Sequence, residues 1–226
     1  MKRLLSLFLF MSIILGASAQ NNKRTVVKME TNMGDITIEL YNETPLHSEN
    51  FKKLVKEGVY DSLLFHRVIN DFMIQGGDPD SKNAEKGQML GEGNMGYLID
   101  AEFRTPEIYH KRGALAMARE GDATNPERRS SSSQFYIVTG RVFNDAQLDR
   151  VQERIDKGTD GKLKLTPEMR ETYKTIGGTP HLDGQYSIFG EVTEGMDIID
   201  KIQKVATDEF DRPLEDVRII KAYIVE

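Results

Sequence analysis

Four residues within the segment 65–79, which reads FHRVINDFMIQGGDP, bring hydrogen-bond donors and apolar side chains together. Arg67 supplies a guanidinium and Gln75 an amide, with the apolar residues Phe72 and Met73 between them in the chain. Alternate residues of a strand point to the same face, so Met73 and Gln75 are expected to share one. This combination suits the binding of a group that is partly apolar and partly polar. The residues alone leave a structural alternative open, with the apolar pair in the core and Arg67 in a salt bridge.

Other motifs for ligand chemistry are weaker. Residues 91–96 match G-x-G-x-x-G, but the dinucleotide fingerprint needs a strand before it and a helix after it. A polar stretch at 81–88 precedes this match, so we interpret it as a Gly-rich surface loop. Residues 78–80 begin like a calcium loop, but Lys82 and Asn83 break the ligand order.

Nucleophilic and metal chemistry lack their usual residues. The chain has no cysteine, which excludes disulfides, thiol nucleophiles and thiolate metal sites. Its four histidines show neither an i, i+4 pair nor HExxH spacing. The serine run at 130–133 belongs to no G-x-S-x-G element. We therefore expect no metal site and no cofactor.

The elements that must position these residues are mostly short strands. Ile36, Ile38 and Leu40 alternate with polar residues, which is the pattern of a half-buried strand. Helices are expected only at 45–57, at 195–204 and within 141–178, so they do not alternate with strands as in a parallel α/β sheet. The pattern favours a mainly β sandwich or closed barrel. The expected strands are 25–30, 35–41, 63–68, 72–75, 114–118, 135–139, 186–191 and 217–225.

The first 19 residues read as a signal peptide. They combine two cations, an apolar run over 4–15 and the small-x-small end Ala17-Ser18-Ala19. That run is shorter than the roughly 20 residues that span a bilayer. We expect cleavage after Ala19, export to the periplasm or the medium, and no stable membrane span in the mature protein. Residues 20–226 are then expected to form one domain.

The charge of the chain argues against one class of partner. Its 30 Lys and Arg residues are outnumbered by 36 Asp and Glu residues, which gives a formal net charge of −6. Nucleic acids require a basic face, so we expect no nucleic-acid binding. Monomer is the default expectation for the oligomeric state.

Four separated blocks, with the opening hairpin and helix, resemble the cyclophilin family of peptidyl-prolyl cis–trans isomerases in family order. The first is the segment 65–79, and Gly113 begins the second, GALAMA, which resembles the family's next pocket strand. The third, 133–137, reads SQFYI and is similar to the family's S-Q-F-F-I element. The fourth, 182–190, reads LDGQYSIFG and is similar to L-D-G-K-H-x-V-F-G, and residues 192–202 resemble the closing helix. The resemblance covers residues 25–226 apart from an insertion.

The resemblance implies a closed eight-stranded antiparallel β-barrel capped by two helices, near 45–57 and 195–204, with a pocket on the outside of the barrel. It also implies catalysis of rotation about X–Pro bonds in proline-containing polypeptides, without metal or cofactor. Arg67 matches the family's catalytic arginine, and Gln75 would orient it. The substrate-binding residues implied are Phe72, Met73, Ala118, Arg119, Gln134, Tyr136, His181, Leu182 and Tyr186.

The chain departs from the family at several of these positions. Tyr136 stands where many members carry Phe, Tyr186 replaces a common histidine, and Arg119 stands where Asn is usual. His181 replaces the tryptophan that several members use to bond cyclosporin, so we expect weakened cyclosporin binding.

The largest departure is the insertion at 141–178, which adds 38 residues where the family has a short connection. Two helices are expected in it, near 145–155 and from Pro167. It enters and leaves close to pocket residues, so it could form a lid or a docking surface, or simply a helical hairpin packed on the barrel side. Two functional hypotheses follow: a foldase for exported proteins, or a non-catalytic chaperone or assembly module that holds proline-containing segments. Arg67 discriminates between them, because binding could survive its loss and catalysis should not.

Overall fold

The structure is a computed structural model that describes residues 23–225. The signal peptide expected over residues 1–19 lies outside this range. Within residues 23–225, no helix combines the length and the apolar character needed to cross a membrane.

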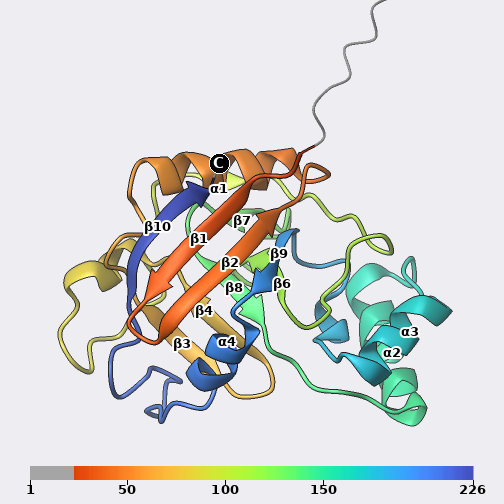
Figure 1. Cartoon of the computed structure of the whole chain (residues 1–226). Coiled ribbons are helices and arrows are strands. Elements are labelled where there is room, and N and C mark those ends of the chain that lie inside the picture. The colour runs from red at the N-terminus through yellow and green to blue at the C-terminus, as the bar shows by residue number, and fades with distance from the viewer. Residues whose placement is uncertain (1–22, 226) are drawn as a thin grey trace, which may run out of the picture.

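The centre of the molecule is an antiparallel eight-stranded sheet (Figure 1). Its strand order is β10-β1-β2-β9-β6-β8-β4-β3, so all eight strands expected from the sequence are confirmed. Two further short strands, β5 (Leu98–Ile99) and β7 (Ser130–Ser131), pair separately. The strands of the main sheet are β1 (Val26–Thr31), β2 (Gly34–Leu40), β3 (Phe65–Ile69), β4 (Met73–Gly76), β6 (Ala114–Met117), β8 (Phe135–Val138), β9 (Ile188–Glu194) and β10 (Ile219–Val225).

The prediction of a closed barrel was wrong, because the sheet curls into a half-barrel whose edge strands β3 and β10 form no ladder. Within residues 23–225, one bridge, Leu64 to Arg218, and three backbone hydrogen bonds of 2.8 Å join the two strands at their first residues and just before them. Alongside β3 itself the neighbour is a loop, in which the Asp211 carbonyl accepts from Val68 N–H at 2.8 Å. Asp211 has a left-handed φ of 65° and Pro213 has no N–H, so this loop cannot extend a strand ladder.

Helices α1 (Pro45–Lys56) and α4 (Met196–Ile202) cover the two ends of the curled sheet, as expected for the capping helices (Figure 1). Pro45 occupies the first turn of α1, where its missing N–H costs no hydrogen bond. The buried face of α1 carries His47, Phe51, Leu54 and Val55 at helical spacing. Burial of this face fixes the helix against the inner side of the sheet.

The main core lies inside the curl of the sheet and is rich in aromatic rings. Phe135 of β8 lies at its centre, edge-to-face with Phe51 at 5.6 Å, with Tyr60 at 5.5 Å and with Phe65 at 6.1 Å between ring centroids. Edge-to-face pairs at these separations are favourable beyond their buried area. Because side chains alternate along a strand, the residues on the other face of β4, β6 and β8 remain available for a site on the outside of the sheet.

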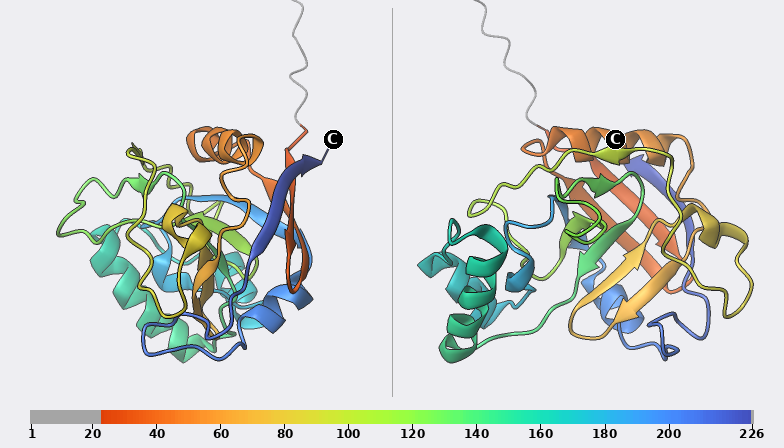
Figure 2. Two further views of the ribbon diagram at one scale, coloured as in Figure 1. Left: turned by 90° about the vertical axis from the view of Figure 1, so that its left-hand side faces the viewer. Right: turned by 180° about the vertical axis from the view of Figure 1, so that it is seen from behind.

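The insertion forms the two expected helices, α2 (Asp145–Thr159) and α3 (Pro167–Thr175). Asn144 and Gln147 make a capping box at the start of α2, and Thr166 caps α3 ahead of Pro167. The helix pair stands beside the sheet in all three views (Figures 1 and 2). A small apolar core of its own holds the pair together: Leu148, Val151, Ile155, Leu163, Leu165, Met169 and Tyr173.

Candidate active site

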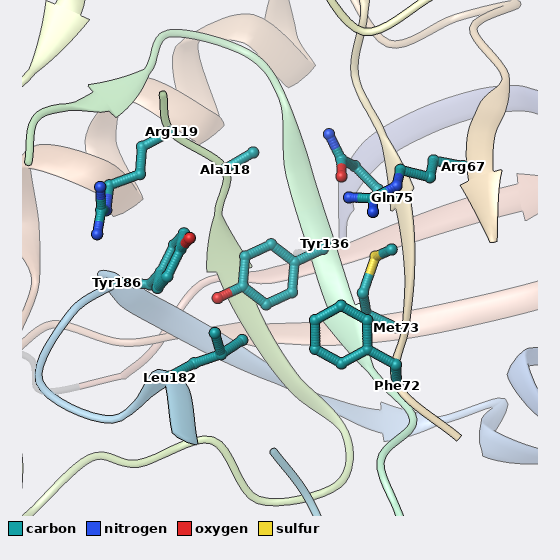
Figure 3. A pocket seen from close by; sticks show the side chains of 9 residues that line it. All are labelled: Arg67, Phe72, Met73, Gln75, Ala118, Arg119, Tyr136, Leu182 and Tyr186. Atoms are coloured by element: carbon teal, nitrogen blue, oxygen red, sulfur yellow. The ribbon is translucent and has the colours of Figure 1, made fainter. Parts of the chain in front are cut away.

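A pocket of about 160 Å³ opens on the face of the sheet opposite the main core (Figure 3). Neighbouring strands present their residues there in register: Arg67 of β3 pairs with Gln75 of β4, and Gln75 pairs with Tyr136 of β8. The pocket therefore assembles from residues that lie far apart in the chain. Its lining residues are Arg67, Phe72, Met73, Gln75, Ala118, Arg119, Tyr136, Leu182 and Tyr186.

The floor and walls of the pocket are apolar. Met73 and the Tyr136 ring are buried at the bottom, with exposed fractions of 2% and 5%. Phe72 and Leu182 are half-buried, with Phe72 at one end of the pocket and Leu182 towards Tyr186 at the other (Figure 3). Leu182 is the last residue of the short 3-10 helix η2 (Pro180–Leu182), which follows directly after the insertion. The pocket can hold a small apolar ring.

Polar groups occupy one rim. The Arg67 side chain is 45% exposed, and its Nε donates to Asp211 Oδ2 at 3.3 Å. Gln75 Nε2 donates to Gln134 Oε1 at 3.1 Å, and Gln134 Nε2 donates to the carbonyls of Gly91 and Gly93, each at 2.8 Å. Gln134 is therefore a buried residue behind Gln75, where it fixes that amide instead of lining the pocket.

The Gly-rich segment 91–96 is a loop, as interpreted from the sequence, and no helix follows it. Gly93 packs so closely on Asp78 that a Cβ would lie 2.0 Å from Asp78 Oδ1. This contact gives Gly93 a structural reason, and Gly91 and Gly96 adopt left-handed φ values of 110° and 83°. Within residues 23–225 no group of three or more metal-ligating side chains is placed to hold a metal ion.

The model of the cyclophilin type peptidyl-prolyl cis–trans isomerase/CLD family matches residues 26–224. The chain belongs to the cyclophilin-type peptidyl-prolyl cis–trans isomerases. A Staphylococcus aureus protein with a provisional assignment to the same activity is 38% identical over 202 residues, which cover 88% of this chain and 91% of that protein. A Streptococcus pyogenes protein, provisionally assigned as a bifunctional phosphatase and isomerase, is 36% identical over 203 residues. Those residues are 88% of this chain but only 38% of that protein.

Solved cyclophilin structures share the fold. Crystal structures of a Cryptosporidium parvum cyclophilin superpose with TM-scores of 0.62 and 0.60 at 26% identity, the second determined in the presence of the dipeptide Ala-Pro. The first covers 90% of this chain and 99% of the other, and the second covers 89% and 99%.

In this cyclophilin the hydroxyl of Tyr136 has a partner inside the protein. It lies 2.9 Å from His110 Nε2, and the two rings are stacked with an interplanar angle of 7°. Burial holds the pKa of Tyr136 well above its ordinary value of 10, so the hydroxyl keeps its proton and donates it to His110. The additional oxygen of Tyr136 is therefore satisfied in the pocket wall.

A buried network connects this wall to the insertion. Asp183 accepts hydrogen bonds from the His110 backbone N–H at 2.8 Å, from His110 Nδ1 at 2.9 Å and from the Tyr173 hydroxyl at 2.6 Å. Because His110 Nδ1–H donates a hydrogen bond to the carboxylate, Nε2 is the acceptor that Tyr136 needs. Sequence reasoning did not identify His110 or Tyr173 as parts of the site. Asp183 could have been identified from the sequence, because it is the acidic residue of the L-D-G element.

Arg119 closes the end of the pocket as a structural residue. Its guanidinium lies 4.5 Å from the centre of the Tyr186 ring, and its Nε donates to the Gln185 carbonyl at 2.9 Å. The resemblance implied that the backbone at Ala118–Arg119 pairs with the substrate. The Ala118 N–H donates to the Gln134 carbonyl at 2.9 Å, and the Ala118 carbonyl accepts from the Ser131 N–H at 2.8 Å. Within the described residues the backbone groups of Arg119 make no such bond, so Arg119 offers the better pairing position.

His181 lies at the edge of the pocket and not inside it. Its ring stacks on Phe72 with centroids 5.6 Å apart and an interplanar angle of 25°. Burial, followed by the charges of His110 and Arg154, lowers the pKa of His181 to about 4. The ring is therefore neutral at physiological pH and presents an aromatic face.

His66 gives the protein an expected dependence of stability on pH. It is buried, neither ring nitrogen has a hydrogen-bond partner within the described residues, and burial lowers its pKa from 6.5 to about 4. The unfolded chain then binds more protons than the folded chain, so we expect the free energy of unfolding to fall as the pH decreases from 6.5 towards 4. Urea unfolding followed by circular dichroism at pH 7, 6 and 5 measures this slope.

The variant His66→Leu is the control for this prediction, because it removes the titrating group and keeps a similar volume. Its unfolding free energy is expected to depend less steeply on pH, with the remaining slope due to His181 and the carboxylates. The same slope in both proteins would contradict the assignment.

Proposed function

We propose that this cyclophilin accelerates rotation about X–Pro bonds in exported or unfolded polypeptides by stabilising the twisted amide with Arg67. The observation that carries this proposal is the adjacency of the Arg67 guanidinium and the Gln75 amide to an apolar pocket of about 160 Å³. The C. parvum structure in the presence of Ala-Pro supports a proline-containing peptide as the ligand of such a pocket.

The chemistry needs no nucleophile. An X–Pro bond rotates over a barrier of about 18–20 kcal/mol, because amide resonance is lost when the bond twists. In the twisted state the proline nitrogen becomes a hydrogen-bond acceptor, which it is not in the planar state. A donor held beside the ring binds the twisted state more strongly than the ground state, and this difference lowers the barrier.

The roles proposed for the residues follow from their positions. Phe72, Met73, Tyr136 and Leu182 surround the proline ring and hold it still. The planar guanidinium fork of Arg67 donates to the proline nitrogen and to the prolyl carbonyl. Asp211 accepts from Arg67 Nε and so orients the fork, and Gln75, fixed by Gln134, supplies a second polar contact.

The proposal is tested with mature protein starting at Gln20. The cis-to-trans rate of an Ala-Ala-Pro-Phe peptide is measured in a protease-coupled assay, and the refolding rate of a proline-limited protein is measured in parallel. Acceleration of both supports a foldase. No acceleration of either, combined with measurable peptide binding, would support the non-catalytic binding module.

We also propose that the protein is exported to the periplasm or the medium and is cleaved after Ala19, which the composition of residues 1–19 supports. Fractionation of expressing cells, with the intact mass of the product, tests this proposal. Cleaved protein outside the cytoplasm is the expected result, and full-length protein confined to the cytoplasm contradicts it.

We expect the inhibition constant of cyclosporin for this protein to lie above the nanomolar range, because His181 replaces the tryptophan that forms a hydrogen bond with the drug in several cyclophilins. The inhibition constant is measured in the same peptide assay. The matched variant His181→Trp is expected to be inhibited more strongly than the wild type. Nanomolar inhibition of the wild type would contradict the prediction.

A further inference from the structure

A second cavity, of about 290 Å³, lies beside the active-site pocket. We call it the basic groove, because Arg141, Arg150 and Arg154 line it. Phe72 lines both cavities, and His181, which stacks on Phe72, lines the groove. The groove is therefore continuous with the wall of the active site.

Among the described residues, none of the three guanidinium groups of the basic groove lies within 4.0 Å of an Asp or Glu oxygen, whereas four of the eight Lys and Arg residues of the insertion are paired with a carboxylate. Arg141 instead lies over the ring of Phe143, 5.1 Å from its centre. Asp71 is the one acidic residue among those that line the groove. Unpaired cations of this kind can accept a carboxylate from a ligand.

The geometry of α2 explains this separation of charge. Gln147, Arg150, Val151 and Arg154 follow one another at i, i+3, i+4 and i+7, so they lie on one face of the helix, which lines the groove. None of the four acidic residues of α2 lines the groove, and three of them form ion pairs within the insertion. Asp145 and Asp149 bind Arg170 at 3.1 and 2.9 Å, and Asp156 binds Lys164 at 2.7 Å.

The positive potential of these arginines extends to the edge of the active site. Burial is the largest cause of the low pKa of His181, and the charges of Arg154 and Arg141 lower this pKa further, against the opposite effect of Asp183. Because His181 is neutral at physiological pH, it does not itself contribute charge to the groove. The attraction for an anion comes from the arginines.

We propose that the basic groove binds the carboxylate of an Asp or Glu residue that follows the proline of a substrate polypeptide. The proposal rests on the proposed function and adds a substrate preference to it. The chain before proline is expected near Arg119, at the end of the pocket opposite Phe72 (Figure 3). The chain after proline then leaves past Phe72 towards the groove. An extended chain advances roughly 3.3 Å per residue, so a residue within about three positions of proline can reach it.

The experiment compares two peptides, Ala-Ala-Pro-Phe-Glu-Ala and Ala-Ala-Pro-Phe-Gln-Ala, with blocked ends. Exchange spectroscopy by NMR measures the catalysed isomerisation of both without a coupling protease, and titration gives their affinities. At low salt the Glu peptide is expected to have a kcat/KM about fivefold higher, the size expected of one or two partly exposed charge pairs. The preference should decrease in 0.5 M NaCl.

Two double variants distinguish the groove from general charge effects. In Arg150→Gln/Arg154→Gln the ratio of the Glu to the Gln peptide is expected to fall to about one. In Lys157→Gln/Lys162→Gln, which removes two cations of the insertion that do not line the groove, the ratio is expected to stay unchanged. An equal rate and affinity of the two peptides with wild type would overturn the groove proposal, as would an unchanged ratio in the first variant.

Failure of the proposed function would give a different experimental result from failure of the groove proposal. If the wild type accelerates neither peptide, catalysis fails, while the affinity ratio still tests the groove. If both peptides are accelerated equally and bind equally, catalysis stands and the groove proposal alone is rejected.

Discussion

Replacing Arg67 with alanine is expected to lower kcat/KM for a proline tetrapeptide by about a hundredfold, which corresponds to roughly 2.7 kcal/mol of barrier lowering. In the proposed mechanism the Arg67 guanidinium is the charged donor that follows the proline nitrogen as the amide twists. Without the guanidinium, the apolar residues of the pocket still bind the proline ring, so the affinity for the peptide should change much less than the rate. The protease-coupled assay measures the rate, and titration by NMR measures the affinity.

Two further variants make this prediction specific. Arg67→Lys keeps the positive charge but loses the planar fork, so an intermediate rate is expected. Asp211→Asn keeps the fork but weakens an ion pair whose side chains are 45% and 40% exposed, so a change of only a few-fold is expected. A rate for Arg67→Ala within threefold of wild type would reject the proposed mechanism.

Replacing Asp183 with alanine is expected to lower the free energy of unfolding by about 3–5 kcal/mol. The carboxylate is completely buried and accepts from three donors, two on His110 and one on Tyr173. Alanine would leave all three donors without a partner in the interior. Urea unfolding monitored by circular dichroism measures the loss, and the method suits a chain that has no tryptophan.

Matched variants separate the contributions within this network. Asp183→Asn keeps an acceptor for the two donors of His110, and the Tyr173 hydroxyl can turn to accept from the new amide, so a smaller loss is expected. Tyr173→Phe removes one hydrogen bond and should cost about 1 kcal/mol. Equal stability of wild type and Asp183→Ala would show that the network does not hold the insertion to the pocket wall.

The positions of the strands and helices could be predicted because their signals are local. Ile36, Ile38 and Leu40 alternate because one face of β2 is buried, and Pro45 begins α1 because it tolerates the first turn. The insertion helices followed from the same kind of evidence, with Thr166 as the cap ahead of Pro167. The residues of the pocket followed from resemblance to cyclophilins, and most of them line one cavity.

The exceptions at the site have physical reasons. Gln134 lies behind Gln75 because its amide is used to hold the Gly-rich loop. The backbone of Ala118 is already bonded within the protein, and His181 packs on the outer side of Phe72. The residue type does not predict these positions, because the same glutamine or histidine side chain can either face the pocket or support a residue that does.

The strand and helix pattern, the resemblance to cyclophilins and most of the residues that line the pocket could be predicted from the sequence, because each depends on local periodicity or on motifs within short segments. The open edges of the sheet at β3 and β10 became known only from the packing of the elements. The tertiary structure also decided that Asp211, 144 residues from Arg67 in the chain, pairs with it, and that Asp183 meets His110. The packing of the elements also brings the three arginines together in one groove. Contacts between distant segments depend on how the elements pack, and the local pattern of residues does not predict them.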